Sequence, residues 1–462
     1  GISMNTKTIP LTLNKKVVDL APLRMAMYKQ SKIIEAIDKK QNSYYLFFYK
    51  CTYLTAVKAT SMKINSHLKR AFTSGIVIDG HHPIVTKLLE NQQTFTLIRF
   101  NPLFKKVSQK YTPLEKLLIF TFFDAFIPFT ELNKLFKSTY YKFRRNGQLY
   151  ASFRVLKAYQ QHDPTDPFAK DMLNNMQFQP YEIMYQDIKK VTSKDPIYVE
   201  SVCFDNLEKE AYVNMLCDLY QSQGRYIDEI AIRLYAQAAD TSLDLAKLQT
   251  LLSTHFEEVE QINIVTTMME ARQQPETQSL LLSLLLNQDN PTTLVDYLVR
   301  YDLKPEQEQL ELIATSFKQV DTKIFTTLFH SLNHRLHELF KDDHPLLENL
   351  INRSISSFFK HYDINQLLDW LKPFVDAGIH LPIEQKLNKI KTLQEDPDQQ
   401  YALGELYVNF NQPEMSIDCF KWEMELNPND PRPVQSLLKV YHELGDKTEA
   451  QAYQQLLIQM QK

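Results

Sequence analysis

The sequence PDQQYALGELYVNFNQPEMSIDCFKWEMELNPND, residues 397–430, is followed by PRPVQSLLKVYHELGDKTEAQAYQQLLIQMQK, residues 431–462. The two stretches share a spacing: Pro397 and Pro431 lie 34 residues apart, and Tyr407 and Tyr441 repeat this offset. A fixed period of this length indicates one supersecondary unit that is repeated and stacked along the chain. The C-terminal end of the protein is therefore predicted to consist of two similar helical units.

Each of the two stretches contains small and aromatic residues that can serve helix packing. Gly404 and Ala450 would let two helices approach closely, while tyrosine and phenylalanine would fill the space between them. The run Asn427–Pro431 contains two prolines and is expected to end a helix. The packing positions are Leu403, Gly404, Tyr407, Phe420 and Pro428 in the first stretch, and Leu437, Tyr441, Gly445 and Ala450 in the second.

These positions resemble the tetratricopeptide repeat (TPR) family over residues 397–462. Weaker TPR-like matches occur near residues 133–166 and 206–240. The pattern departs from the family at Pro413, Ser416 and Glu423. The resemblance implies a helical scaffold whose groove binds a protein or peptide partner.

The family's carboxylate clamp is only partly matched. Its positions correspond to Tyr401, Glu405, Gln435 and Lys439, and of these only Lys439 suits a carboxylate. We therefore do not expect capture of a peptide C-terminus. The resemblance implies these groove residues: Glu405, Asn409, Gln435, Lys439 and His442.

The composition limits the class of protein. The chain has 462 residues, 44% of them hydrophobic and 11% aromatic, which is typical of folded globular domains. It contains only 8 glycines, and none of them form the glycine-rich loop that a P-loop, a dinucleotide fold or a kinase needs. Four separated cysteines without a CxxC motif favour a reducing compartment. No signal-peptide pattern or membrane-length apolar stretch stands out, so we expect a cytoplasmic protein.

Charge is divided unequally along the chain. Residues 1–160 contain 26 Lys+Arg and 8 Asp+Glu, whereas the remainder contains 26 Lys+Arg and 47 Asp+Glu. The first part thus carries a net charge of +18 and the second part −21. This asymmetry indicates two parts with different partners.

Residues 5–110 are expected to form a mixed α and β region. The apolar spacing in Leu20–Lys40 predicts a helix, and the aromatic and β-branched residues of Tyr44–Ala59 predict one long strand or two short ones. The further expected elements are a short helix at Lys63–Phe72, a turn between Ile76–Asp79 and Pro83–Val85, and a strand at Thr94–Phe100.

The sequence after residue 110 begins with a clear helix start, Thr112-Pro113-Leu114-Glu115, which has the pattern of a capping box. This helix is expected to run to about Phe126, with a second one near residues 131–137. Two interpretations remain open for residues 113–159: a helix-turn-helix followed by the basic and aromatic run Tyr140–Arg145, or a TPR-like helix pair with Gly147 at its turn.

The predicted fold is mainly α: a helical repeat array, that is, a TPR-like solenoid, with a smaller N-terminal α/β domain. We expect a basic α/β domain at residues 1–110 and degenerate TPR-like helices at 111–240. A helical array at 241–396 and two TPR-like units at 397–462 complete the chain.

No pattern of catalytic residues stands out. His330, His334 and His337 have metal-like spacing, but they fall mostly opposite the apolar face of their helix and are interpreted as solvated. His81-His82 is interpreted as part of a turn, and neither HExxH nor GxSxG occurs. We predict no catalytic residue, no metal and no cofactor, while an enzyme with an unrecognised site remains an alternative.

The basic first part carries the other binding prediction. Its lysines and arginines are interspersed with aromatic residues, a mixture that suits a phosphate backbone with bases stacked on rings. Docking onto the acidic part of the same chain or of a second copy, and binding to an anionic membrane or acidic protein, remain open. The candidate polyanion-binding residues are Lys69, Arg70, Lys105, Lys106, Lys110, Lys142, Arg144 and Arg145.

Together these patterns predict a non-enzymatic adaptor or regulatory scaffold. Its helical repeats would bind a protein or peptide, and residues 1–160 would bind DNA or RNA. One alternative is a peptide-sensing transcriptional regulator, which requires a helix-turn-helix near Pro113–Arg145. Another is a membrane-surface or complex-assembly protein, and homo-oligomerisation is a further expectation.

Overall fold

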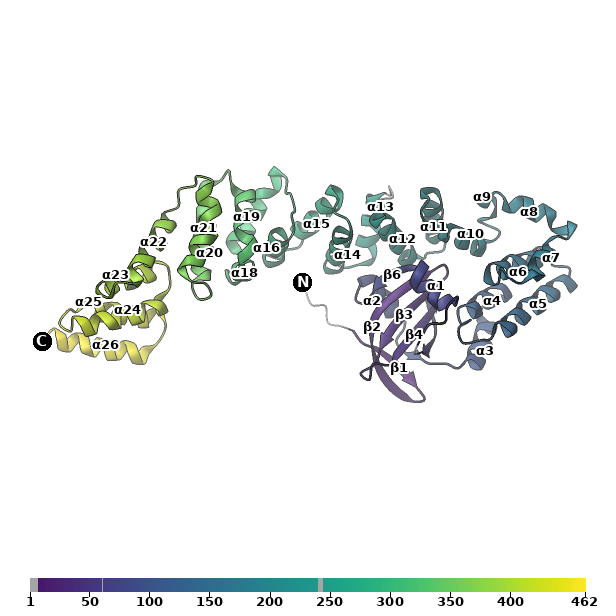
Figure 1. The fold of residues 1–462 in the computed structure, drawn as a ribbon, viewed down its shortest axis with the longest axis horizontal. Helices are drawn as coiled ribbons and strands as arrows, with labels where there is room; N and C mark the ends of the chain where they lie inside the picture. The colour runs from purple at the N-terminus through teal and green to yellow at the C-terminus, as the bar shows by residue number, and fades with distance from the viewer. Residues whose placement is uncertain (1–6, 60, 240–243) are drawn as a thin grey trace. The chain divides into compact units, whose positions relative to one another are not determined.

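The computed structural model describes residues 7–59, 61–239 and 244–462. The chain divides into two compact units, Gly1–Thr277 and Gln278–Lys462, and the division falls inside helix α15 (Pro275–Asn287). The prediction of a mainly helical protein with a small α/β part at its N-terminus is confirmed (Figure 1). The four finer segments proposed from the sequence stay predictions.

The first unit contains all the strands of the described residues. These are β1 (Ile9–Leu13), β2 (Lys16–Tyr28), β3 (Ser31–Ile37), β4 (Ser43–Tyr49), β5 (Thr52–Lys58), β6 (Ile76–Asp79) and β7 (Phe95–Thr96). Its helices are α1 (His67–Ser74), α2 (Pro83–Glu90), α3 (Phe100–Lys110), α4 (Pro113–Thr121), α5 (Phe129–Arg145), α6 (Leu149–His162), α7 (Pro167–Leu173), α8 (Gln179–Tyr185), α9 (Ile188–Val191), α10 (Pro196–Phe204), α11 (Glu210–Ser222), α12 (Tyr226–Ala238), α13 (Leu245–His255) and α14 (Glu258–Ala271).

The second unit is helical throughout its described residues. After α15 come α16 (Pro291–Arg300), α17 (Leu310–Gln319), α18 (Lys323–Thr327), α19 (Phe329–Phe340), α20 (His344–Phe358), α21 (Ile364–Asp376), α22 (Pro382–Gln394), α23 (Gln400–Asn409), α24 (Pro413–Leu426), α25 (Arg432–Glu443) and α26 (Lys447–Met460).

The sheet has the strand order β5-β4-β3-β2-β1-β7, with β6 also paired to β2. All of these pairs are antiparallel except β1 with β7. The long strand β2 pairs with β1 through its first half and with β3 through its second half. The two ends of the sheet approach each other, because the Tyr53 and Thr55 hydroxyls donate to the carbonyls of Thr96 and Ile98, at 2.9 and 2.8 Å.

The helix predicted for Leu20–Lys40 is wrong, because this segment forms β2 and β3. Lys29 has a φ of +54°, which turns the chain tightly between the two strands. Both faces of β3 are covered, so almost every residue in it is buried and the alternation typical of a strand is hidden. Of the two alternatives for Tyr44–Ala59, one long strand or two short ones, the second is correct, and the strands are β4 and β5.

Three smaller predictions in this region need comment. The strand expected at Thr94–Phe100 is only the two residues of β7, since Phe100 already begins α3. The turn expected after Ile76–Asp79 is present, and Pro83 begins helix α2 directly behind it. The predicted short helix is confirmed as α1, which starts at His67, four residues later than expected.

The sheet lies between two helical layers. On one face Phe47 packs against Phe123, just after α4, and Tyr45 packs against Phe72 of α1. On the other face Lys32 of β3 reaches α12, and α2 contacts α12 and α14. The helices that follow the sheet in sequence thus fold back over it, and the sheet core is shared with both layers (Figure 1).

Helix α4 begins with the predicted capping box, in which the side chains of Thr112 and Glu115 each accept a backbone N–H of the other residue. The second helix was expected to end near residue 137, but α5 runs unbroken to Arg145. The reason is that Leu132, Phe136 and Tyr140 continue one buried stripe at a spacing of four residues. The basic and aromatic run therefore lies inside α5, and α5 and α6 form a helix pair across Gly147.

Among the described residues, five helix pairs are closed by turns of the same construction. In each, the residue after a left-handed position donates its N–H to the carbonyl of an aromatic residue five positions earlier. The aromatic and left-handed residues are Phe143 and Gly147, Tyr220 and Gly224, Phe374 and Gly378, Tyr407 and Asn411, and Tyr441 and Gly445. The pairs α5–α6 and α11–α12 fall at the two weaker TPR-like matches, although membership of that family stays a prediction.

The C-terminal stretches form the pairs α23–α24 and α25–α26, and α24 also packs on α25. An added Cβ at Gly404 would lie 2.7 Å from the Phe420 ring, so the glycine permits this close approach. Phe420, Leu437, Tyr441 and Ala450 belong to one core cluster, as the packing positions predicted. Within the described residues no helix combines the length and apolar character needed to span a membrane.

Candidate functional site

Several cations of the basic first part are held by carboxylates of the helices that follow. Lys29 in the β2–β3 turn pairs with Asp205. Lys32, near the start of β3, pairs with Asp228. Three further pairs link α5 and α6 to later residues: Lys137 with Asp166, Arg154 with Asp195, and Lys157 with Glu182. Part of the charge division therefore serves docking within the chain, which was one of the open interpretations.

The centre of this docking is a buried ionic network between β3, α10 and α12. Asp228 lies between Lys32 and Arg225, and Arg225 Nε donates to Asp228 Oδ2 at 2.6 Å. The guanidinium of Arg225 also donates twice to the Glu200 carboxylate, at 2.6 and 2.9 Å. Burial alone would raise the pKa of Asp228, but the charges of Lys32 and Arg225 lower it below its ordinary value. Two cations and two anions thus compensate each other out of contact with water.

A buried serine–histidine contact lies on the opposite face of the sheet. Ser31 Oγ is 2.7 Å from His67 Nε2, and Asp124 accepts the backbone N–H of His67 at 2.8 Å. The Ser31 hydroxyl also donates to the Tyr28 carbonyl, and all three side chains are buried. A nucleophile needs a site where a substrate can reach it, so this arrangement anchors α1 to the sheet and offers no catalytic dyad.

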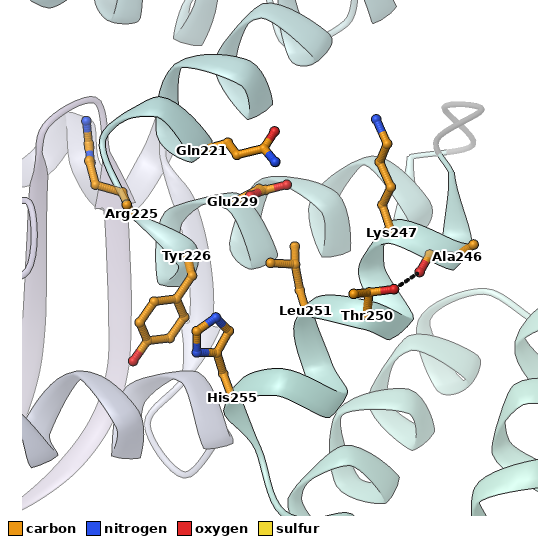
Figure 2. Close-up of a pocket in the computed structure, with 10 residues that line it drawn as sticks. Gln221, Arg225, Tyr226, Glu229, Ala246, Lys247, Thr250, Leu251 and His255 are labelled. Atoms are coloured by element: carbon orange, nitrogen blue, oxygen red, sulfur yellow. Dashed lines mark hydrogen bonds between the residues drawn. The ribbon is translucent and has the colours of Figure 1, made fainter.

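An open pocket of about 470 Å³ lies beside the ionic network, between α11, α12 and α13 (Figure 2). Tyr226 and His255 stack on one wall with ring centroids 3.8 Å apart, while Arg225 points away towards the sheet. Glu229 is already paired with Arg233. The pocket therefore lies on the solvent side of the docking interface. The charge of Glu229, its acidic residue, is neutralised by Arg233.

The predicted polyanion-binding residues separate into two groups. Arg70 pairs with the buried carboxylate of Asp124 at 3.6 Å, and Arg144 donates to Gln177 and lies over the Phe178 ring. The other six residues make no ion pair within the part of the chain that the structure describes, and all are exposed: Lys69, Lys105, Lys106, Lys110, Lys142 and Arg145.

Lys116 on α4 adds a cation that the sequence analysis missed. Its ammonium lies 3.8 Å from the centroid of the Phe104 ring on α3. Burial and the charge of Lys142 on α5 lower the pKa of Lys116. We call the surface formed by Lys105, Lys106, Lys110, Lys116, Lys142 and Arg145 the α3–α5 cationic surface. Lys69 lies apart from it, on α1.

The predicted groove residues lie on the first helices of the two C-terminal pairs. Glu405 and Asn409 are on α23, and Gln435, Lys439 and His442 are on α25. All five are exposed, and their spacing of three or four residues places them on one face of each helix. The two helices are connected through Tyr401, whose ring lies under Arg432 and whose hydroxyl is 3.5 Å from Ser436 Oγ.

Metal-binding geometry is not present among the described residues, where no three His, Cys, Asp or Glu side chains converge. His330 and His334 are exposed on α19, as their helical spacing predicted. The four cysteines are free thiols, and burial raises the pKa of Cys203 to about 12 and of Cys217 and Cys419 to about 11. These values describe unreactive thiols.

Comparison of the chain with models of known protein families and with curated proteins finds no match.

Proposed function

We propose that this protein is a non-enzymatic scaffold that binds nucleic acid through its α3–α5 cationic surface and a protein or peptide through its C-terminal helix pairs. The observation that carries the first half is the pair Lys116 and Lys142. Burial and the charge of Lys142 on the neighbouring helix lower the pKa of Lys116, and no carboxylate among the described residues forms an ion pair with either lysine. A cluster of like charges repels itself until an anion neutralises it.

The choice of a nucleic acid rests on the residues beside these cations. The Phe104 ring lies under Lys116, and Tyr141, 43% exposed, precedes Lys142. Lysines supply contacts to phosphates, and neighbouring aromatic rings supply surfaces on which unpaired bases stack. A single-stranded RNA or DNA uses both features.

Docking onto the chain's own acidic part does not account for these cations. That docking uses a different set of basic residues, of which Lys32, Arg154 and Lys157 are examples. The remaining net charge of the first unit is still +7, because residues 1–277 contain 35 Lys+Arg and 28 Asp+Glu. A basic surface of this kind raises the association rate with a polyanion and makes its affinity dependent on salt.

For the second half of the proposal, α23 and α25 would act as the inner helices of a TPR-like solenoid. Glu405, Asn409, Gln435, Lys439 and His442 would then line a groove with mixed charge. Such a lining suits a peptide that carries both acidic and basic side chains and does not require a free carboxylate terminus.

A gel-shift titration of the full chain with single-stranded and duplex RNA and DNA tests the proposed nucleic-acid binding. Binding should weaken strongly between about 50 and 200 mM salt. Equal binding by a neutral polymer, or no binding to any of the four nucleic acids at the lower salt concentration, would overturn the proposal.

A further inference from the structure

Two arginines of the second unit cap the C-terminal ends of helices in the same way. Arg335 on α19 donates to the carbonyl of Leu298 in the last turn of α16 and to that of Leu303, three residues after this helix, at 2.6 and 2.7 Å. Arg353 on α20 donates to the carbonyls of Phe317 and Val320 at the end of α17, at 2.7 and 2.9 Å. Each guanidinium thereby satisfies carbonyls that have no partner within their own helix.

The two arginines differ in their counter-charges. Arg335 pairs with Glu338 at 2.6 Å and lies 3.6 Å from Asp302. Arg353 has no carboxylate partner in the part of the chain that the structure describes. Burial lowers the pKa of Arg353, and no acidic group raises it again. A partly buried cation without a counter-charge is costly unless something else supplies the negative charge.

An open surface cavity of about 430 Å³ lies beside Arg353. It is formed by Asn349, Asn352, Arg353 and Ser356 of α20 together with Asn411 and Gln412 from the α23–α24 turn. The Gln412 amide holds that turn against α20 by donating to the Ser356 carbonyl at 2.7 Å. Every residue that lines the cavity is polar, and Arg353 is the charged one.

The lining still has hydrogen-bond donors to offer. A guanidinium carries five N–H groups, and Arg353 uses two of its nitrogens on carbonyls. The side-chain amides of Asn349, Asn352 and Asn411 make no hydrogen bond within the described residues. Neither Asp321, which accepts the N–H of Lys323, nor Glu414, which pairs with Lys360 at 3.7 Å, forms an ion pair with Arg353.

We propose that this cavity binds an oxyanion, a carboxylate or phosphate group carried by a ligand, with Arg353 as the counter-charge and the three asparagine amides as further donors. A planar guanidinium with fixed N–H directions suits both groups. The inference is independent of the nucleic-acid surface, because the cavity lies wholly in the second unit.

The test measures binding to the full chain by calorimetry at constant ionic strength. The probes are inorganic phosphate, acetate, and three short peptides that differ only in a central phosphoserine, glutamate or glutamine. If the cavity takes a phosphate group, phosphate or the phosphoserine peptide should bind in preference to chloride. If it takes a carboxylate, acetate or the glutamate peptide should do so. The glutamine peptide should not bind in either case. Tighter binding of the peptides than of the free ions would identify a protein as the source of the oxyanion, and equal binding would identify a free ion.

Two variants make the test specific. Replacing Asn352 by aspartate, N352D, places a carboxylate beside Arg353 and should weaken oxyanion binding by about tenfold or more, the ratio expected from losing one hydrogen bond to a charged group. The control N388D makes the same change at an exposed site on α22 and should leave binding unchanged. Equal affinities for N352D, N388D and the unaltered chain, or an absence of oxyanion binding above that of chloride, would overturn the proposal. Because R353K removes the fork that caps α17, N352D and not R353K is the decisive variant.

Discussion

The ammonium group of Lys32 on β3 and the carboxylate of Asp228 on α12 form an ion pair in which both side chains are almost completely buried, at 1% and 0% exposure. The pair joins a residue of the sheet to one that lies almost two hundred positions later in the chain. A buried ion pair therefore ties the sheet to a helix that follows it in the same unit. Folding must bring Lys32 of the sheet together with Asp228 of α12.

Replacing Lys32 by methionine, K32M, should destabilise the first unit by about 3–5 kcal/mol, because Arg225 alone then faces Asp228 and Glu200 and one buried negative charge stays uncompensated. The double variant K32M/D228L removes both charges and should recover most of the loss. Urea unfolding followed by circular dichroism measures both effects.

The matched control for this pair is Lys29. Its Nζ lies 3.3 Å from Oδ2 of Asp205, and the Asp205 side chain is half exposed. K29M should cost no more than about 1 kcal/mol, as is usual for a surface pair. Similar losses for K29M and K32M, or no recovery in the double variant, would contradict a buried network.

Acid should weaken the first unit through its buried histidines, of which His82 and His162 are two. Burial lowers the pKa of His82 and of His162 to about 4, from 6.5 in the unfolded chain. Because the folded pKa is depressed, the stabilisation is complete above pH 6.5 and is lost as the pH falls through about 4. Each histidine contributes about 3 kcal/mol to this loss over the full range. Urea midpoints measured between pH 7 and pH 4 test how far the free energy of unfolding falls as the pH is lowered.

The variant H162F separates this effect from general acid denaturation. His162 stacks between Phe129 and Phe136, with centroids 4.9 and 5.3 Å away, and neither of its ring nitrogens has a partner in the structure. Phenylalanine fits this environment and cannot take up a proton, so H162F should reduce the pH dependence. The exposed His81 provides the control H81Q, whose pH profile should match that of the unaltered chain.

Gly404 sets the distance between α23 and α24. G404A would place a methyl group 2.7 Å from the Phe420 ring and should destabilise the second unit by about 1–3 kcal/mol, the usual cost of overpacking. The double variant G404A/F420L creates space and should recover part of that loss. A thermal midpoint for G404A equal to that of the unaltered chain would show that the two helices are not in close contact.

The amino-acid sequence predicts local features of this fold well and distant ones poorly. The capping box at Thr112 and Glu115 and the packing residues Gly404 and Phe420 follow from short spacings, and the structure contains them. The apolar spacing of β2 and β3 predicts a helix wrongly, because helices cover both faces of the sheet and the alternation typical of a strand is absent. Tertiary burial there outweighs the local pattern.

The same contrast holds for the candidate sites. The basic residues of the α3–α5 cationic surface are visible in the sequence as charge, but Lys116 joins them only because α4 packs between α3 and α5. In the sequence alone, nothing distinguishes Arg353 from the other arginines. Its significance depends on the absence of a carboxylate among the described residues around it, which the order of residues does not reveal.

The most direct test of the proposed function compares two charge reversals of equal size in the full chain. K142E/R145E alters the α3–α5 cationic surface, and K39E/K40E alters an exposed pair just after β3. Affinity for single-stranded RNA or DNA is measured at several salt concentrations for both variants and for the unaltered chain. We predict a lower affinity and a shallower salt dependence for K142E/R145E alone. Equal losses in the two variants, or an unchanged salt dependence in K142E/R145E, would contradict a nucleic-acid site on α3–α5.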